Sequence, residues 1–190
     1  MKSLFLAAAL TATAGMASAA AEKYVLDASH SQVLFSYDHL GFSTTFGMFS
    51  GFEGEIMLDA EDPGASSVNV SMPLMSMFTG WEKRESHFMS EDFFGAEEGD
   101  MITFTSTGIE VTGDDTALIT GDLTMNDVTK SVVLDAKLNQ MGVHPRAGKP
   151  WAGFDATTTV LRSDFGVGNF APFVGDEVEV MISIEAMKAE

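Results

Sequence analysis

Residues 177–185 read Glu-Val-Glu-Val-Met-Ile-Ser-Ile-Glu, and this stretch decides the fold class. Its apolar residues at positions 178, 180, 182 and 184 are separated by Glu179, Met181 and Ser183. Successive side chains of a β-strand point to opposite faces, so this alternation predicts a strand with one apolar and one largely polar face. The polar face must meet water, and the apolar face must therefore be buried inside the protein.

The same alternation recurs upstream and predicts about eight strands in all. Eight antiparallel strands can close into a barrel whose interior is just wide enough for side chains or one small ligand. We therefore expect an all-β fold, an extended eight-stranded antiparallel β-barrel. The apolar residues assigned to its inner face are Val33, Phe35 and Tyr37; Phe46, Met48, Phe52, Ile56 and Leu58 in one long run over 44–58; Val68, Val70, Met72 and Leu74; Ile102 and Phe104; Ile119, Leu123 and Met125; Val132, Leu134 and Leu138; Phe154, Ala156 and Val160; and Val178, Val180, Ile182 and Ile184.

The opposite face of these strands is polar. Glu177, Glu179 and Glu185 alternate with the last apolar set, and Asp135 and Lys137 alternate with Leu134 and Leu138. A transmembrane barrel has the reverse arrangement, with apolar side chains outside and polar ones inside. The charged face is therefore expected to meet solvent, which argues against an outer-membrane porin.

One stretch departs from the strand pattern. Residues 81–89 lack alternation and are rich in helix-forming residues. Thr79 is the expected N-cap, because Glu82 follows it three residues later. We expect a short helix near residues 81–89 at one end of the barrel, with a further turn at 91–94.

The N-terminus has the pattern of a secretory signal peptide. Lys2 supplies a positive charge, Leu4–Leu10 form a short apolar run, and Ala17-Ser18-Ala19 fits the cleavage pattern of small residues. We expect residues 1–19 to be cleaved off as a signal peptide and residues 20–190 to form a single domain. The run is too short to span a membrane. An apolar N-terminal strand or anchor is the alternative.

Composition excludes several classes of site and partner. The chain has no cysteine, so disulfides, thiolate metal sites and thiol nucleophiles are excluded. Without Lys2, 9 basic and 28 acidic residues remain, a net charge of −19. Such a surface repels phosphates, so we expect no nucleic-acid partner. No later segment is apolar enough over a sufficient length to cross a bilayer as a helix.

The side chains expected on the inner face of the barrel are bulky, and many of them are flexible. The chain contains 13 Met and 15 Phe. Methionine adapts its shape to apolar ligands, but an ordinary packed core would have the same composition, and both readings stay open. If the interior is a cavity, the residues expected to bind a ligand are Val33, Phe35, Tyr37, Phe46, Met48, Phe52, Val70, Met72, Phe104, Ile119, Leu134, Phe154, Ala156, Val160 and Ile182.

Short motifs follow one another along the chain: YVLDASHS (24–31), HLGFS (39–43), GMF (47–49), RESHF (84–88), DFF (92–94), ITFTST (102–107), GDLT (121–124) and RSDFG (162–166). In this order they resemble the YceI-like family, although Phe88 stands where the family usually has leucine. The resemblance implies a lipocalin-like barrel, exported to the periplasm, that binds a polyisoprenoid or another long-chain amphiphile. It implies a homodimer in some members, and neither an activity nor a cofactor is carried over from it.

Three polar residues are candidates for contacting a ligand head group. Arg162 follows Val160 on the inner face, where it would meet a head group or, as the favoured alternative, form an ion pair with Asp164 or another carboxylate. Arg84 and His87 lie three residues apart on the expected helix and so share a face. They would contact a head group at the barrel entrance or bind loop carbonyls.

No catalytic or metal-binding pattern stands out. His30, His39 and His87 match no known zinc spacing, so we expect no metal. Residues 166–171 fit a dinucleotide-binding pattern, but Pro172 follows directly and no βαβ unit is present, so we expect no cofactor. The leading hypothesis is a lipid carrier. The alternatives are an enzyme acting on such a lipid at the barrel mouth, and a packed barrel that binds a protein partner.

Overall fold

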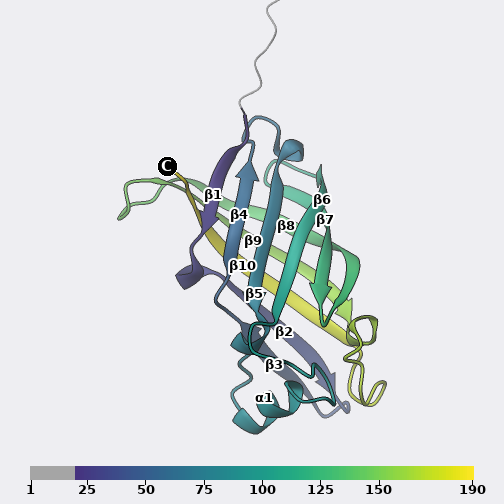
Figure 1. Ribbon diagram of the computed structural model, residues 1–190. Coiled ribbons are helices and arrows are strands. Elements are labelled where there is room, and N and C mark those ends of the chain that lie inside the picture. The colour runs from purple at the N-terminus through teal and green to yellow at the C-terminus, as the bar shows by residue number, and fades with distance from the viewer. Residues whose placement is uncertain (1–19) are drawn as a thin grey trace, which may run out of the picture.

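The computed structural model describes residues 20–190, and the expected signal peptide at 1–19 lies outside the described residues (Figure 1). Within these residues, ten strands form one antiparallel sheet. They are β1 (Glu22–Leu26), β2 (Gln32–His39), β3 (Ser43–Phe49), β4 (Glu53–Leu58), β5 (Ser67–Pro73), β6 (Met101–Val111), β7 (Thr116–Met125), β8 (Val128–Val143), β9 (Pro150–Leu161) and β10 (Glu177–Lys188). The helices are α1 (Glu82–Phe88) and the short 3-10 turns η1 (Ala28–His30), η2 (Pro63–Ala65), η3 (Leu74–Ser76) and η4 (Arg162–Phe165).

Eight of the strands close into a barrel, which confirms the expected fold. The ring runs β1-β4-β5-β6-β7-β8-β9-β10 and is closed where Leu26 of β1 pairs with Ala186 of β10. The first half of β10 pairs with β2 instead, and Val180 lies opposite Phe35 there. Strands β2 and β3 therefore extend the wall beyond the ring, toward the end of the barrel that carries α1 (Figure 1).

The long strand expected over residues 44–58 is wrong, because this run forms two strands. Between β3 and β4 the chain turns at Gly51, which has a φ of 72°. The turn changes which residues face inward. In β3, Gly47 lies opposite Phe35, and both face the interior. The ring of Phe35 lies over Gly47, where a Cβ atom would be 2.2 Å from the ring carbon Cζ.

Phe46 and Met48 are therefore not on the inner face. Each lies next to Gly47 in the strand, and neighbouring side chains of a strand point to opposite faces. Phe46 is 59% exposed, and the backbone of Met48 forms an isolated bridge with Phe78 at the free edge of β3. The inner-face residue of this strand that the sequence reading missed is Phe49, which is buried opposite Val33.

The helix at residues 81–89 is confirmed as α1, but its cap differs from the expected one. Trp81, not Thr79, occupies the N-cap position, and it makes no side-chain capping bond. Instead, the carboxylate of Glu85 accepts a hydrogen bond of 2.7 Å from the backbone N–H of Thr79. The segment 91–94 forms the expected turn, and the backbone N–H of Phe94 bonds to the carbonyl of Phe88.

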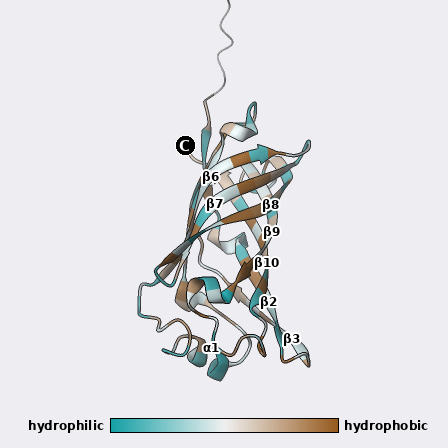
Figure 2. Cartoon of the chain, turned by 90° about the vertical axis from the view of Figure 1, so that its right-hand side faces the viewer, coloured by the Kyte–Doolittle hydropathy of each residue, from teal (hydrophilic) through white to brown (hydrophobic). Residues whose placement is uncertain are grey.

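The interior of the barrel is unevenly filled. On the β2 wall, Val33, Phe35 and Tyr37 are buried. On β7 and β8 the inner-face residues, such as Ile119 and Leu134, are only half-buried although they point inward. Figure 2 shows hydrophobic and hydrophilic positions alternating along the strands of this wall. Inward side chains that remain partly accessible indicate an open space inside the barrel.

Candidate functional site

The barrel contains a cavity of about 420 Å³, to which all ten strands and the segment around α1 contribute lining residues. Its volume lies within the range of roughly 300–1,000 Å³ that is typical of small-molecule sites. Most of the lining side chains are aliphatic or aromatic. On the β8 and β9 wall, Ala136 and Ala156 lie opposite each other and leave room between larger side chains. The packed-core reading is therefore disfavoured by the structure.

Nearly all the residues expected to bind a ligand do line this cavity; Phe46 and Met48, which lie on the outer face of β3, do not. Those that line it are Val33, Phe35, Tyr37, Phe52, Val70, Met72, Phe104, Ile119, Leu134, Phe154, Ala156, Val160 and Ile182. Sequence reasoning missed Leu26, because its strand β1 was not recognised. It also missed Phe49, because Phe46 and Met48 were assigned to the inner face of the same strand. It also missed Phe88 and Phe94, because a helix and a turn carry no alternation signal.

The end of the cavity near α1 is closed by aromatic side chains. Phe88 and Phe94 line it, and both are partly buried against the core. The ring of Phe88 meets Tyr37 edge-on at 6.2 Å between centroids and Phe93 at 5.2 Å. Such edge-to-face contacts are favourable and fix the rings relative to one another. The segment from α1 through Phe94 thus forms an apolar floor.

Arg162 also lines the cavity, but its polar atoms are directed to the protein. The guanidinium donates to the carbonyls of Gly175 (2.9 Å), Val167 (2.8 Å), Val174 (3.1 Å) and Asn169 (3.3 Å). All four carbonyls belong to the connection between β9 and β10. Burial lowers the pKa of the guanidinium, and this effect is opposed by the negative charge of Asp176.

The expected ion pair of Arg162 is wrong, because within residues 20–190 its guanidinium pairs with neither Asp164 nor another carboxylate. The carboxylate of Asp164 faces Lys130 at 3.7 Å. The nearby carboxylate is that of Asp176, which accepts hydrogen bonds from the hydroxyl and backbone N–H of Ser163. Both bonds lower the pKa of Asp176, and the bond from the hydroxyl of Ser163 has the larger effect. Arg162 therefore organises the β9–β10 connection through carbonyls, a role that strand periodicity cannot reveal.

Most of this chain matches a known domain family. Residues 24–186 match the YceI-like domain family. The chain belongs to the YceI-like family. The protein YceI of Escherichia coli (strain UMN026) is 39% identical over 181 residues, which cover 95% of this chain and 94% of that protein. The resemblance of the sequence motifs to this family is confirmed.

Solved structures share the fold of this YceI-like protein. Burkholderia cenocepacia BcnA superposes with a TM-score of 0.75 at 22% identity, covering 84% of this chain and 98% of that chain. A polyisoprenoid binding domain from Saccharophagus degradans gives a TM-score of 0.68 at 14% identity, covering 87% of this chain and 98% of that chain. At these identities the likeness concerns the fold.

The opposite end of the cavity in this YceI-like protein is open and acidic. Val111 and Met141 line the cavity there, and both are about half exposed to solvent, so they mark a mouth. Asp59, Asp114 and Asp115 also contribute to the lining at this end. We call these three carboxylates the acidic rim. The side chain of Asp59 is buried and accepts hydrogen bonds from the backbone of the β4–β5 turn.

Arg84 and His87 do not line the cavity. The guanidinium of Arg84 donates to the carbonyl of Thr79 at 3.3 Å and lies over the ring of Trp81. His87 contacts the carboxylate of Asp92, with 3.0 Å between Nε2 and Oδ2. Of the two roles considered for this pair, a bond to a loop carbonyl is the one seen for Arg84. Within residues 20–190, no helix has the length and apolar character needed to cross a membrane.

Proposed function

We propose that this YceI-like protein is a periplasmic carrier that holds a long apolar amphiphile, a polyisoprenoid or an isoprenoid quinone-like lipid, inside its barrel. The observation that carries the proposal is the cavity of about 420 Å³ with its aliphatic and aromatic lining. The fold shared with a polyisoprenoid binding domain supports this ligand class. In this proposal residues 1–19 direct export as a signal peptide and are cleaved off, which leaves residues 20–190 as one domain.

Transfer of the lipid chain from water into this apolar cavity is enough to drive binding, and no covalent bond is made or broken. Each methylene group moved from water into an apolar site contributes about 0.8 kcal/mol, so a few isoprene units offset the cost of association. No histidine lines the cavity within the described residues. Of the two lining cations, Arg162 is bonded to four carbonyls and Lys137 lies on β8 beside the acidic rim. These observations favour a binding protein over an enzyme acting at the barrel mouth.

Native mass spectrometry of the protein purified from a bacterial periplasm tests the proposal. We expect a chain that begins at Ala20 and carries one long-chain lipid, which organic extraction then releases for identification. A protein mass without lipid, unchanged after incubation with isoprenoid quinones and prenyl phosphates, would contradict the carrier function. It would support a barrel that acts through a protein partner.

The acidic rim makes a prediction about the head group. An apolar chain that fills the cavity from the mouth leaves its head group beside Asp114 and Asp115. Like charges repel, so an isoprenoid alcohol or quinone should bind several-fold more tightly than a prenyl diphosphate of the same chain length. Titrations of both ligands at low and high salt measure the difference, which should shrink as salt screens the rim. Equal affinities at low salt would place the head group elsewhere.

A second candidate function, binding of a protein partner, is favoured by apolar side chains on the outer surface near α1. Phe42 is 89% exposed and Phe173 is 75% exposed. The two lie close, since the backbone N–H of Leu40 bonds to the carbonyl of Phe173. Exposed apolar patches commonly mark interaction sites. We propose that a second copy packs here as a homodimer. Light scattering should then give the mass of a dimer for the wild type and a mass closer to that of a monomer for a Phe42→Ser variant.

A further inference from the structure

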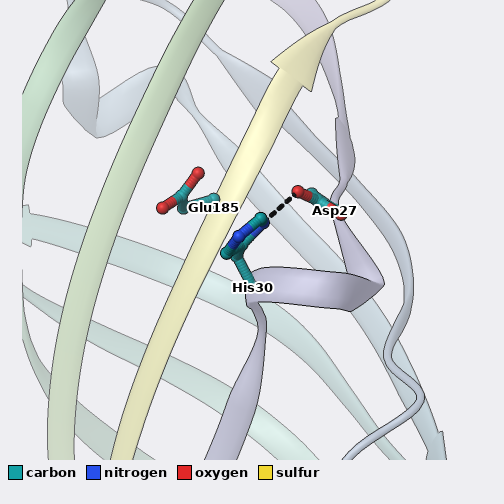
Figure 3. Close-up of side chains that lie close together, drawn as sticks. All are labelled: Asp27, His30 and Glu185. Carbon is teal, nitrogen blue, oxygen red and sulfur yellow. Dashed lines mark hydrogen bonds and ion pairs between the residues drawn. The ribbon is translucent and has the colours of Figure 1, made fainter. Parts of the chain in front are cut away.

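Three potential metal ligands meet on the outside of the barrel, away from the cavity. Asp27 caps the short turn η1, His30 is the last residue of this turn, and Glu185 lies on the adjacent strand β10. The imidazole Nδ1 of His30 is 2.7 Å from Oδ2 of Asp27. One donor atom from each of the three side chains lies within 4.8 Å of the other two. Figure 3 shows His30 between the two carboxylates.

Both carboxylates are held in place by groups other than the histidine. The hydroxyl and backbone N–H of Ser29 donate to Oδ1 of Asp27, which leaves Oδ2 directed to His30. The indole N–H of Trp151 donates to Oε2 of Glu185 at 2.8 Å, which leaves Oε1 free for another partner. Metal ligands in proteins are oriented by outer partners of this kind.

The charge and position of the cluster also suit a cation. Within residues 20–190, neither Asp27 nor Glu185 forms an ion pair with a lysine or arginine. His30 is exposed, so water can complete the coordination. Two ligand atoms of a tetrahedral zinc ion, each bound at about 2.0–2.2 Å, lie roughly 3.4 Å apart. A small movement of the side chains therefore closes the site around an ion.

We propose that Asp27, His30 and Glu185 bind one divalent transition-metal ion, with Zn²⁺ the ion that best fits an imidazole and two carboxylates. On binding, the ion takes the place of the proton shared between His30 Nδ1 and Asp27 Oδ2, and this proton passes to solvent.

The site lies where β10 changes its partner. Ser183 of β10 still pairs with Gln32 of β2, whereas Ala186 pairs with Leu26 of β1. Glu185 lies between these two pairings, beside η1, which separates β1 from β2. A bound ion therefore links the end of β1, the turn η1 and strand β10 at the point where the ring closes. We expect it to raise the melting temperature of the barrel.

Isothermal titration of the untagged mature protein with Zn²⁺ tests the proposal. We expect one ion per chain in the wild type. Because changes in outer partners alone weaken metal binding about 10- to 100-fold, loss of a direct ligand in His30→Ala or Glu185→Gln should weaken it at least about tenfold. The matched control is His87→Ala, since His87 contacts a single carboxylate, that of Asp92. This variant should bind Zn²⁺ like the wild type.

NMR spectra of the histidine ring nitrogens test the site without any substitution. Zn²⁺ should shift the signals of His30 and leave those of His39 and His144 in place. No saturable binding of one ion in the wild type would overturn the proposal. The same holds for an unaltered isotherm in folded His30→Ala, or for ring shifts confined to other histidines.

Discussion

Replacing Ala156 by tryptophan should abolish most of the lipid binding while the barrel stays folded. Ala156 lines the cavity, lies opposite Ala136 of β8 and pairs with Ile182 of β10. An indole at this position fills space that the chain of a lipid would occupy. If it displaces about four methylene groups at about 0.8 kcal/mol each, the loss is roughly 3 kcal/mol, or about 100-fold in Kd.

The matched control for this variant is Thr157→Trp. Thr157 is the next residue of β9, and its side chain is exposed on the outer face. The same substitution there should leave the affinity for an isoprenoid quinone within about twofold, because surface changes rarely disturb a distant site. Affinity is measured by titration, and circular dichroism verifies the fold of both variants. If Ala156→Trp is folded and binds as the wild type does, the lipid does not occupy this part of the barrel.

The inner faces of β8, β9 and β10 can be assigned from the amino-acid sequence for a simple physical reason. Each of these strands has one side facing the cavity and one facing water, so hydrophobicity largely alternates along it. Phe154, Ala156 and Ile182 could therefore be placed on the inner face from periodicity alone. Closure into a ring is expected from the number of strands, because eight antiparallel strands can close into a barrel.

The errors came from features that periodicity does not encode. Gly51 turns the chain within a run that continues to look apolar, and this reversed the faces of Phe46 and Met48. Along β3 the true inner position at 47 is a glycine, which has no side chain to signal its direction; its space is taken by the ring of Phe35 from the neighbouring strand. Such an exchange between strands is visible only in three dimensions.

The proposed metal site illustrates the same limit. The histidines were judged by their spacing along the chain, and that spacing matches no zinc pattern. Glu185 lies 155 residues after His30 and meets it only because β10 pairs on both sides of η1. The sequence therefore predicted the wall of the cavity well and the polar contacts between distant segments poorly.

Substitution of Arg162 should destabilise the whole β9–β10 connection. Its guanidinium donates to four carbonyls of residues 167–175. A hydrogen bond from a charged group contributes about 1.5–3 kcal/mol, but the guanidinium is only partly buried, so water replaces some of these bonds. We expect Arg162→Met to lower the free energy of unfolding by about 2–4 kcal/mol. At about 2–4 °C per kcal/mol for a chain of this size, the melting temperature should fall by roughly 5–15 °C.

The variant Arg162→Lys separates this structural role from contact with a lipid head group. Lysine keeps the positive charge, but a single ammonium group cannot reproduce the planar fork that reaches four carbonyls. It should therefore lose most of the stability that Arg162→Met loses. The control Arg84→Met removes a guanidinium with one carbonyl bond and should cost less than about 1 kcal/mol. A stable Arg162→Met variant with weakened binding of an anionic lipid, restored in Arg162→Lys, would instead assign Arg162 to the head group.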